Sequence, residues 1–145
     1  MHTFPARRHV PHWEHPGGTV CLTWRLQRDQ PPLRPEERDV VLEVIRTGEP
    51  RFATLLAIVV MDDHVHALVR PEPGSTAQRL ATAWKGMSAH RLCGEFGRVG
   101  PVWQRAYFDR WMRSADHTLA CRAYVIENPT RRWPDIQDYP WVFAR

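Results

Sequence analysis

The sequence predicts an α+β domain in which an antiparallel sheet is covered by helices on one face. Apolar and polar residues alternate over 19–26 and 64–70, with the two-residue period of strands that have one buried face. The mostly apolar run 52–61 indicates a buried strand between them. Apolar residues at helical spacing behind capping residues mark three further stretches: 36–46, 75–92 and 114–129. Strand, helix, two strands, helix, strand, helix is the element order of such a sandwich.

The composition indicates a single domain over residues 1–145. The 20 basic and 16 acidic side chains give a net charge of +4, which permits nucleic-acid binding without establishing it. No apolar run reaches the roughly 20 residues of a membrane span, and the N-terminus lacks a signal-peptide pattern. The three scattered cysteines form no CxxC pair and are typical of reduced thiols. We therefore expect a cytoplasmic protein that has no contact with a membrane.

The first predicted strand and helix each show one apolar face. In the strand, one face carries Val20, Leu22, Trp24 and Leu26. Pro35 suits the first turn of the following helix, and Gly48 suits its end. The buried stripe of this helix is expected to consist of Val40, Val41, Val44 and Ile45.

The second and third strands are predicted to form a hairpin that turns at Asp62 and Asp63. Because side chains in a strand repeat every two residues, His64 and His66 point the same way, roughly 7 Å apart at the backbone. Val65 and the alternate residues after it lie on the other face. Two imidazoles side by side suit a divalent cation, which then needs a third ligand from elsewhere.

The second half of the chain is predicted to contain two helices and one strand. A capping-box pattern at 75–78 starts a helix that ends near Leu92, with Trp84 on its core side. The segment 102–108 is expected to be the fourth strand. The last helix starts near Ser114 or Asp116 and is expected to stop at Pro129.

Both ends of the chain are predicted to be irregular. The arm 1–18 is rich in proline, glycine and basic residues, so it suits either a phosphate-contacting arm or a solvated tail. The spacing of His9, His12 and His15 also permits a metal site, although a proline-rich arm seldom holds ligands rigidly. The tail 130–145 is expected to be irregular or to wrap back over the domain.

The last helix supplies candidates for the missing ligand and for a nucleophile. Tyr124 and Asn128 are four residues apart, so they lie one above the other on one helix face. We expect a different face, with Leu119, Ala123 and Ile126, to contact the core. Two imidazoles and the Asn128 amide oxygen suit Mg²⁺ or Mn²⁺ and leave positions open for phosphate oxygens. Tyr124 can then attack the phosphorus of a phosphodiester.

Three motifs together resemble a known family. They are Asp63-His64-Val65-His66 in a strand, Gly100-Pro101-Val102-Trp103-Gln104-Arg105-Ala106-Tyr107-Phe108-Asp109-Arg110, and Tyr124-Val125-Ile126-Glu127-Asn128-Pro129. In this order they resemble the REP-associated tyrosine transposases, which are relatives of the single-tyrosine HUH insertion-sequence transposases. The resemblance extends over most of the chain, from about His12 to Pro129.

This resemblance implies a ferredoxin-like domain that cuts and rejoins single-stranded DNA at hairpin-forming repetitive extragenic palindromes. It assigns His64, His66 and Asn128 as metal ligands, and Tyr124 as the nucleophile that takes the 5′ phosphate. It also implies a protein that acts as a monomer. Asp62 and Asp63 stand where family members often have Pro-Asn, so Asp63 either orients an imidazole or reshapes the turn. The segment 130–133 also departs from the usual small-residue ending.

Simpler structural roles remain open for the same residues. His64 and His66 can be polar positions under the tail, Tyr124 can be a packed helix tyrosine, and Asn128 can belong to the helix stop. Residues expected to contact DNA are Arg7, Arg8, Lys85, Gln104, Arg105, Arg110 and Arg113. Any single one of these charges can instead be merely solvated.

We therefore predict a metal-dependent, nucleoid-associated enzyme that nicks and transfers DNA strands at hairpins. Two alternatives stay open. One is a hairpin-binding protein on the same scaffold that no longer cuts, and the other is a metal-dependent hydrolase in which water attacks instead of tyrosine. Only the first function requires a covalent link between protein and DNA.

Overall fold

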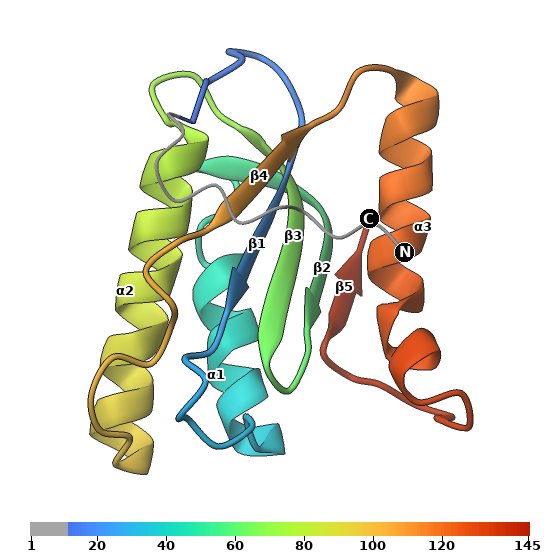
Figure 1. The fold of residues 1–145 in the computed structure, drawn as a ribbon. Coiled ribbons are helices and arrows are strands. Elements are labelled where there is room, and N and C mark those ends of the chain that lie inside the picture. The colour runs from blue at the N-terminus through green and yellow to red at the C-terminus, as the bar shows by residue number, and fades with distance from the viewer. Residues whose placement is uncertain (1–11) are drawn as a thin grey trace.

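The computed structural model describes residues 12–145, which form a five-stranded sheet flanked by three helices (Figure 1). In chain order, the elements are β1 (Val20–Arg25), α1 (Pro35–Arg46), β2 (Ala53–Val60), β3 (His64–Pro71), α2 (Ala77–Phe96), β4 (Phe108–Trp111), α3 (Ala115–Arg132) and β5 (Val142–Ala144). None of the helices within this range is long and apolar enough to cross a membrane.

The sheet has the strand order β4-β1-β3-β2-β5, and all neighbouring strands are antiparallel. The element order β1-α1-β2-β3-α2-β4, with strand order β4-β1-β3-β2, is the ferredoxin-like arrangement. The predicted α+β class is therefore confirmed. The helix α3 and the short strand β5 follow this unit, and β5 extends the sheet beside β2.

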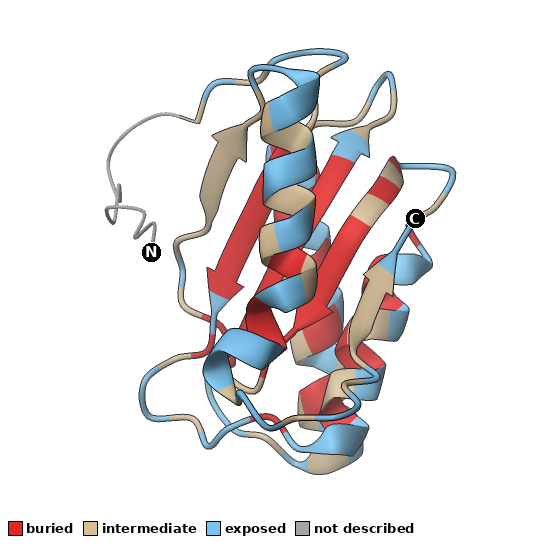
Figure 2. Ribbon diagram, turned by 90° about the vertical axis from the view of Figure 1, so that its right-hand side faces the viewer, coloured by how far each residue is buried: buried red, intermediate tan, exposed pale blue. Residues whose placement is uncertain are grey.

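The helices lie on both faces of the sheet, which corrects the expectation of one covered face. Helices α1 and α2 cover one face, whereas α3 packs against β2 and β3 from the other (Figures 1 and 2). The reason is that the second face is also partly apolar, with Cys21, Ala57, Val59, Met61 and Leu68 buried there. Covering these side chains removes apolar surface from water, which stabilises the fold.

Strand β2 supplies apolar side chains to both faces and contains a β-bulge. The register with β3 shifts between Leu55 and Ala57. Leu55 faces the core under α1 and α2, as Ile58 does after the bulge. Ala57 and Val59 face α3 instead. Because β2 is buried on both faces, its sequence is a continuous apolar run, and the extra residue of the bulge shifts which positions face each side.

The main core lies between the sheet and the pair α1 and α2. Trp24 of β1 is fully buried, and its ring centroid lies 6.2 Å from that of Trp84 and 6.3 Å from that of Trp103. The predicted core position of Trp84 is thus confirmed. All four apolar residues predicted for the stripe of α1 are also buried.

Helix α2 begins one residue later than the capping pattern predicts and extends a turn further. Its N-cap is Thr76, whose side chain accepts the backbone N–H of Arg79. The carboxylate of Glu14, from the irregular segment before β1, accepts the N–H of Ala77 at 2.8 Å. This long-range contact adds to the local cap at Thr76, because each satisfies a free N–H group of the first turn.

The fourth strand lies later in the chain than predicted. Residues 102–107 are irregular apart from a bridge between Trp103 and Leu26, and β4 begins only at Phe108. Val102 and Trp103 are consecutive and both buried, so the segment lacks the alternation of a strand. The Trp103 ring N–H donates to the Ser88 hydroxyl at 2.9 Å, which fixes the segment against α2.

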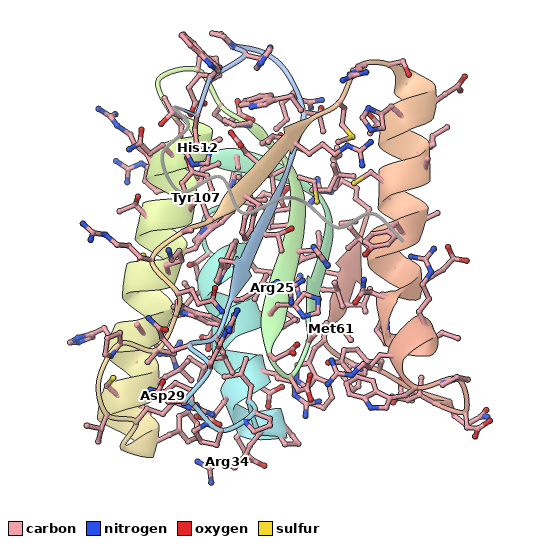
Figure 3. The ribbon with its side chains drawn as sticks, viewed as in Figure 1. His12, Arg25, Asp29, Arg34, Met61 and Tyr107 are labelled. Carbon is pink, nitrogen blue, oxygen red and sulfur yellow. The ribbon has the colours of Figure 1, made fainter. Side chains whose placement is uncertain are left out.

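The described part of the N-terminal arm, residues 12–18, is irregular as predicted. His12 lies 2.8 Å from a carboxylate oxygen of Asp109 and stacks on Tyr107 with ring centroids 4.2 Å apart (Figure 3). His15 packs against Trp111 instead of pointing toward His12. Because His9 lies outside the described residues, the predicted alternative of a metal site in the arm stays open.

The C-terminal tail is more ordered than predicted. After α3 it returns to the sheet, and β5 pairs with β2. The Tyr139 hydroxyl donates to the backbone oxygen of Val60 at 2.6 Å, and the Trp141 ring N–H donates to Asp39. The tail thus wraps back over the domain, which is one of the two predicted alternatives, and residues 133–141 are irregular; only the end of α3 and the short strand β5 add regular structure.

Candidate active site

The β2–β3 hairpin presents two imidazoles to the face covered by α3. The turn at Asp62 and Asp63 leads directly into β3, where His64 and His66 alternate with residues of the main core. Their ring centroids lie 4.7 Å apart, and the residues are only 8% and 4% exposed. The geometry expected from the sequence for this pair is therefore present.

Each imidazole is held through its Nδ1 atom. The Nδ1 atom of His64 lies 2.7 Å from a carboxylate oxygen of Asp63, and that of His66 lies 2.8 Å from the hydroxyl of Thr23 on β1. Within residues 12–145, neither Nε2 atom has a hydrogen-bond partner. Partners on one ring nitrogen fix the ring and direct the other nitrogen toward a ligand. Asp63 thus makes the contact with His64 that the predicted orienting role would require.

The surroundings favour a neutral imidazole at His66 and an ionised carboxylate at Asp63. Burial lowers the pKa of His66 well below its usual value, and the nearby His64 and Arg25 lower it further. The hydrogen bond from His64 holds the pKa of Asp63 well below its usual range. A neutral imidazole keeps the nitrogen lone pair that a metal ion needs.

Helix α3 lies across this face and carries Tyr124 and Asn128. Its N-cap is Ser114, one of the two predicted starts, whose hydroxyl accepts the N–H of His117. The buried residues of α3 are Val125, Asn128 and Pro129, all in its C-terminal half, and its N-terminal half is largely exposed (Figure 2).

The sheet-facing side of α3 differs from the predicted apolar stripe. Leu119 is 63% exposed, and Ala123 is also exposed. The face that carries Tyr124 and Asn128 turns toward the histidines instead, because the sheet offers polar imidazoles as well as apolar side chains there. The expectation of a core stripe through Leu119, Ala123 and Ile126 was wrong.

Tyr124 approaches the imidazole pair directly. Its ring centroid lies 5.7 Å from that of His66, with the rings nearly edge to face. On α3, the Arg131 guanidinium lies over the Tyr124 ring, 4.4 Å from its centroid, and its closest carboxylate contact is Glu127 at 3.8 Å. The phenol ring and a guanidinium of α3 thus lie on the same face as the two imidazoles of β3.

Asn128 is buried inside α3 instead of ending it. The helix continues through Pro129 to Arg132, so the predicted stop at Pro129 was wrong. The bond that proline cannot donate is lost, but the last turn is held by Trp133, whose N–H donates to the Pro129 oxygen. Asn128 is 9% exposed, and its side chain has no hydrogen bond to any residue in the described range.

The two stretches that depart from the family pattern contact one another. Arg132, in the last turn of α3, lies 3.1 Å from a carboxylate oxygen of Asp62 and 3.4 Å from one of Asp63. Because Asp63 also binds His64, a chain of polar contacts joins the end of α3 to the first imidazole. This ion-paired contact fixes the helix that carries Tyr124 against the hairpin turn.

The donor set fits a hard divalent cation. Residues 12–145 contain no group of three or more histidine, cysteine or acidic side chains that could hold a metal ion. A third donor beside His64 and His66 would therefore be of another kind, such as the Asn128 amide, which makes no hydrogen bond within residues 12–145. Imidazole and amide oxygen together suit Mg²⁺ or Mn²⁺.

Three residues predicted to contact DNA lie away from the imidazoles or are engaged within the protein. Lys85 is on α2, on the opposite face of the sheet, where its ammonium donates to the backbone oxygen of Arg105. Burial lowers the pKa of Lys85. The Gln104 amide donates to the Leu26 oxygen at 3.0 Å. Arg105 is exposed, and its binding to DNA stays a prediction.

Of the other residues predicted to contact DNA, Arg110 and Arg113 lie within the described part of the chain. Arg110 of β4 lies opposite Cys21 in the register, so it is on the face covered by α3. Arg113 is exposed just before α3. Arg7 and Arg8 lie outside the described residues.

Thr23 and Arg25 were missed in the sequence. Both belong to the polar face of the first alternating strand, which was the available signal. What the sequence did not indicate is that β1 pairs with β3, which brings Thr23 opposite His66 and Arg25 opposite His64.

Comparison with known proteins identifies the family. A family model described as IS200-like transposase matches residues 20–128, which is more than half of the chain. The solved structure of a REP-associated tyrosine transposase bound to a REP hairpin is 20% identical, with a TM-score of 0.76, over 92% of this chain and 81% of that one. A candidate transposase from Deinococcus radiodurans R1 is 25% identical, with a TM-score of 0.56, over 87% and 97%. No curated protein matches.

The matched region contains the imidazole pair, Tyr124 and Asn128. The resemblance seen in the sequence motifs is therefore confirmed at the level of the family and the fold. This chain belongs to the IS200-like transposases, a family of DNA-processing proteins, and has the fold of a REP-associated tyrosine transposase.

Proposed function

We propose that this protein is a metal-dependent endonuclease and strand transferase that acts on single-stranded DNA at hairpins through a 5′-phosphotyrosine intermediate. The observation that carries this proposal is the approach of the Tyr124 ring on α3 to the His66 ring on β3, 5.7 Å between centroids. A phenol beside a pair of imidazoles is a nucleophile beside a metal-binding group. Membership of the transposase family adds independent support.

His64, His66 and Asn128 are the residues proposed to hold the cation, Mg²⁺ or Mn²⁺. The free Nε2 atoms and the unpartnered amide support this assignment. When bound, such a cation polarises a phosphodiester and offsets the charge that develops on its oxygens. Asp63 and Thr23 hold the two rings in place for this task.

The proposed step is an exchange of one phosphodiester bond for another. The phenolic oxygen of Tyr124 forms a bond to phosphorus while the bond from phosphorus to the 3′ oxygen breaks. The phenolic proton passes to solvent, and the departing 3′ oxygen takes up a proton to become a hydroxyl. Attack by a 3′ hydroxyl on the phosphotyrosine reverses these changes, so strands are rejoined without an external energy source.

The proposed substrate is a DNA hairpin with a flanking single strand. A protein with the same fold has been solved with a REP hairpin bound, which supports a hairpin substrate here. Exposed basic side chains elsewhere on the domain, such as Arg113 just before α3, suit the phosphate backbone. Tyr124 and the imidazoles come from a single chain, which supports action as a monomer.

Trapping the covalent intermediate tests this function. The protein is incubated with labelled hairpin DNA and Mn²⁺, and adducts that survive denaturation are counted by gel. We expect Tyr124→Phe to abolish the adduct, with at least about a thousandfold loss of nicking, yet to leave hairpin binding nearly unchanged. Tyr139→Phe is the matched control, because Tyr139 packs against the same face but its hydroxyl is bonded to Val60.

Each other outcome identifies one alternative. Hairpin binding without any cleavage by the wild type would indicate a binding protein that no longer cuts. Cleavage without an adduct, unaffected by Tyr124→Phe, would indicate a hydrolase in which water attacks. Adduct formation that persists in Tyr124→Phe would overturn the assignment of the nucleophile.

A further inference from the structure

Arg25 is the last residue of β1 (Figure 3). It is opposite His64 in the antiparallel register between β1 and β3. The alternate residues before it on the same strand, Thr23 and Cys21, face α3, so the side chain of Arg25 starts from that face as well. Tyr124 approaches the imidazoles from α3, whereas Arg25 flanks them from β1.

The charge of Arg25 is available to a ligand. Its side chain is exposed, and no carboxylate of residues 12–145 lies within ion-pairing distance of its guanidinium. Other guanidinium groups nearby are used within the protein, since Arg132 pairs with Asp62 and Arg131 lies over the Tyr124 ring.

The charge of Arg25 lies close to the site, because Arg25 is opposite His64 and two residues from Thr23, which contacts His66. An uncompensated cation next to two nearly buried imidazoles favours an anion between them and the helix.

We propose that Arg25 is a catalytic residue that binds a non-bridging oxygen of the phosphodiester attacked by Tyr124. This role rests on the proposed function and adds a residue that touches the reacting group. A guanidinium offers N–H donors in a planar fork that matches two phosphate oxygens. It would therefore offset the negative charge that grows on these oxygens as the phenol attacks. Arg25 moves no proton in this step.

Arg70 is a matched control on the same strand face. It lies on β3 in the alternation that contains His64 and His66, and it is exposed, like Arg25. From the rise of a strand, it is about 20 Å away from His64. Arg70→Gln therefore removes the same charge from the same face, away from the imidazoles.

The experiment compares adduct formation with DNA binding in the full-length protein. A DNA hairpin with a short single-stranded flank is used, and neutral methylphosphonate is placed at each flank phosphate in turn. We expect Arg25→Gln to slow adduct formation by about a hundredfold while the Kd changes only a few-fold. Arg25→Lys should restore part of the rate, and Arg70→Gln should leave it unchanged.

The methylphosphonate series distinguishes a contact of Arg25 with one particular phosphate from a general attraction between its charge and DNA. Binding is measured in the Tyr124→Phe background, so the readout does not depend on cleavage. With Arg25 present, methylphosphonate at one flank phosphate should weaken binding, and this effect should disappear in Arg25→Gln alone. Equal effects of Arg25→Gln and Arg70→Gln on rate and binding would overturn the assignment of Arg25. If the wild type formed no adduct, but methylphosphonate at one position still weakened binding only when Arg25 is present, the proposed function would be overturned. The contact between Arg25 and that phosphate would then stand.

Discussion

Asn128 is the candidate third ligand beside the two imidazoles. The residue is 9% exposed, and within residues 12–145 its side-chain amide makes no hydrogen bond. Its amide atoms keep some contact with solvent, so the oxygen is accessible to a ligand. An accessible amide oxygen without a protein partner suits a third ligand for a hard cation.

Replacing Asn128 should separate metal binding from folding. We expect Asn128→Ala to weaken Mn²⁺ binding at least about tenfold, because one of three protein ligands is lost. The free energy of unfolding without metal should change little, because the amide makes no hydrogen bond within residues 12–145 that the substitution would break. Electron paramagnetic resonance of free Mn²⁺ measures the first effect and urea unfolding the second. Asn128→Asp, which keeps an oxygen, is the control that should retain binding, and unchanged affinity in Asn128→Ala would exclude the ligand role.

A second buried polar residue, Glu37 of α1, has a structural role far from the site. Its carboxylate is 1% exposed and accepts two N–H groups of Arg98, which follows α2. It also accepts the backbone N–H of Arg34 at 3.0 Å. Burial raises the pKa of Glu37, but these hydrogen bonds outweigh burial and lower the pKa to about 2.

The pairing of Glu37 and Arg98 predicts a defined loss of stability in acid. Because the folded pKa is about 2 and the unfolded value is 4.5, the stabilisation is complete above pH 4.5 and is lost as pH falls toward 2. The full loss corresponds to about 3 kcal/mol. We expect Glu37→Gln to be destabilised by about 3 kcal/mol at pH 7 and to lack this part of the acid dependence. Urea unfolding at a series of pH values measures both, and parallel pH profiles of the two proteins would contradict the prediction.

At the scale of elements, α3 is fixed to the sheet mainly through its C-terminal half. Its buried residues begin at Val125, and its last turn is joined to the hairpin turn by Arg132. The N-terminal half exposes even Leu119. An element with few buried contacts opens locally at low cost, so the contacts at its C-terminal end determine how firmly Tyr124 is held.

Removing the contact of Arg132 should loosen α3 without unfolding the domain. Because the Arg132 side chain is 42% exposed, its pairing with Asp62 and Asp63 contributes no more than about 1 kcal/mol. We expect Arg132→Gln to speed amide exchange in α3 by up to about fivefold, and to leave exchange in β1 and β3 unchanged. Hydrogen exchange read by mass spectrometry measures this. Arg113→Gln, an exposed charge before α3, is the control; equal exchange in both variants would show that the ion pair does not hold the helix.

At the scale of the whole molecule, the sheet separates a structural face from a functional one. Helices α1 and α2 bury the main apolar core against one face. The other face combines a smaller apolar cluster with the imidazoles, Thr23 and Arg25. Polar groups can be kept next to α3 because the other face already supplies most of the apolar burial.

Binding of a cation to the imidazole pair should raise the free energy of unfolding of the whole domain. A ligand that binds only the folded state at a hundred times its Kd stabilises it by about 2.7 kcal/mol. We expect Mn²⁺ to raise the Tm of the wild type and EDTA to reverse the increase. The double variant His64→Gln/His66→Gln should show no increase. An equal increase in the double variant, measured by scanning calorimetry, would show that the cation binds elsewhere.

The sequence alone determined the features that depend on local periodicity. The alternation around His64 and His66 predicted their shared side, and the four-residue spacing of Tyr124 and Asn128 predicted their shared helix face. The element order predicted the α+β class, and the apolar stripe of α1 was predicted residue by residue. Each follows from the geometry of a single strand or helix, which is set by backbone repeat.

Only the tertiary structure decided which surfaces meet. The partner of each strand decides that Thr23 lies opposite His66, and the packing of α3 decides that Tyr124, instead of Leu119, faces the sheet. The continuation of α3 past Pro129 likewise depends on contacts of its last turn, not on proline's local preference. These outcomes depend on free energies summed over residues that are far apart in the chain, and local pattern carries no information about such sums.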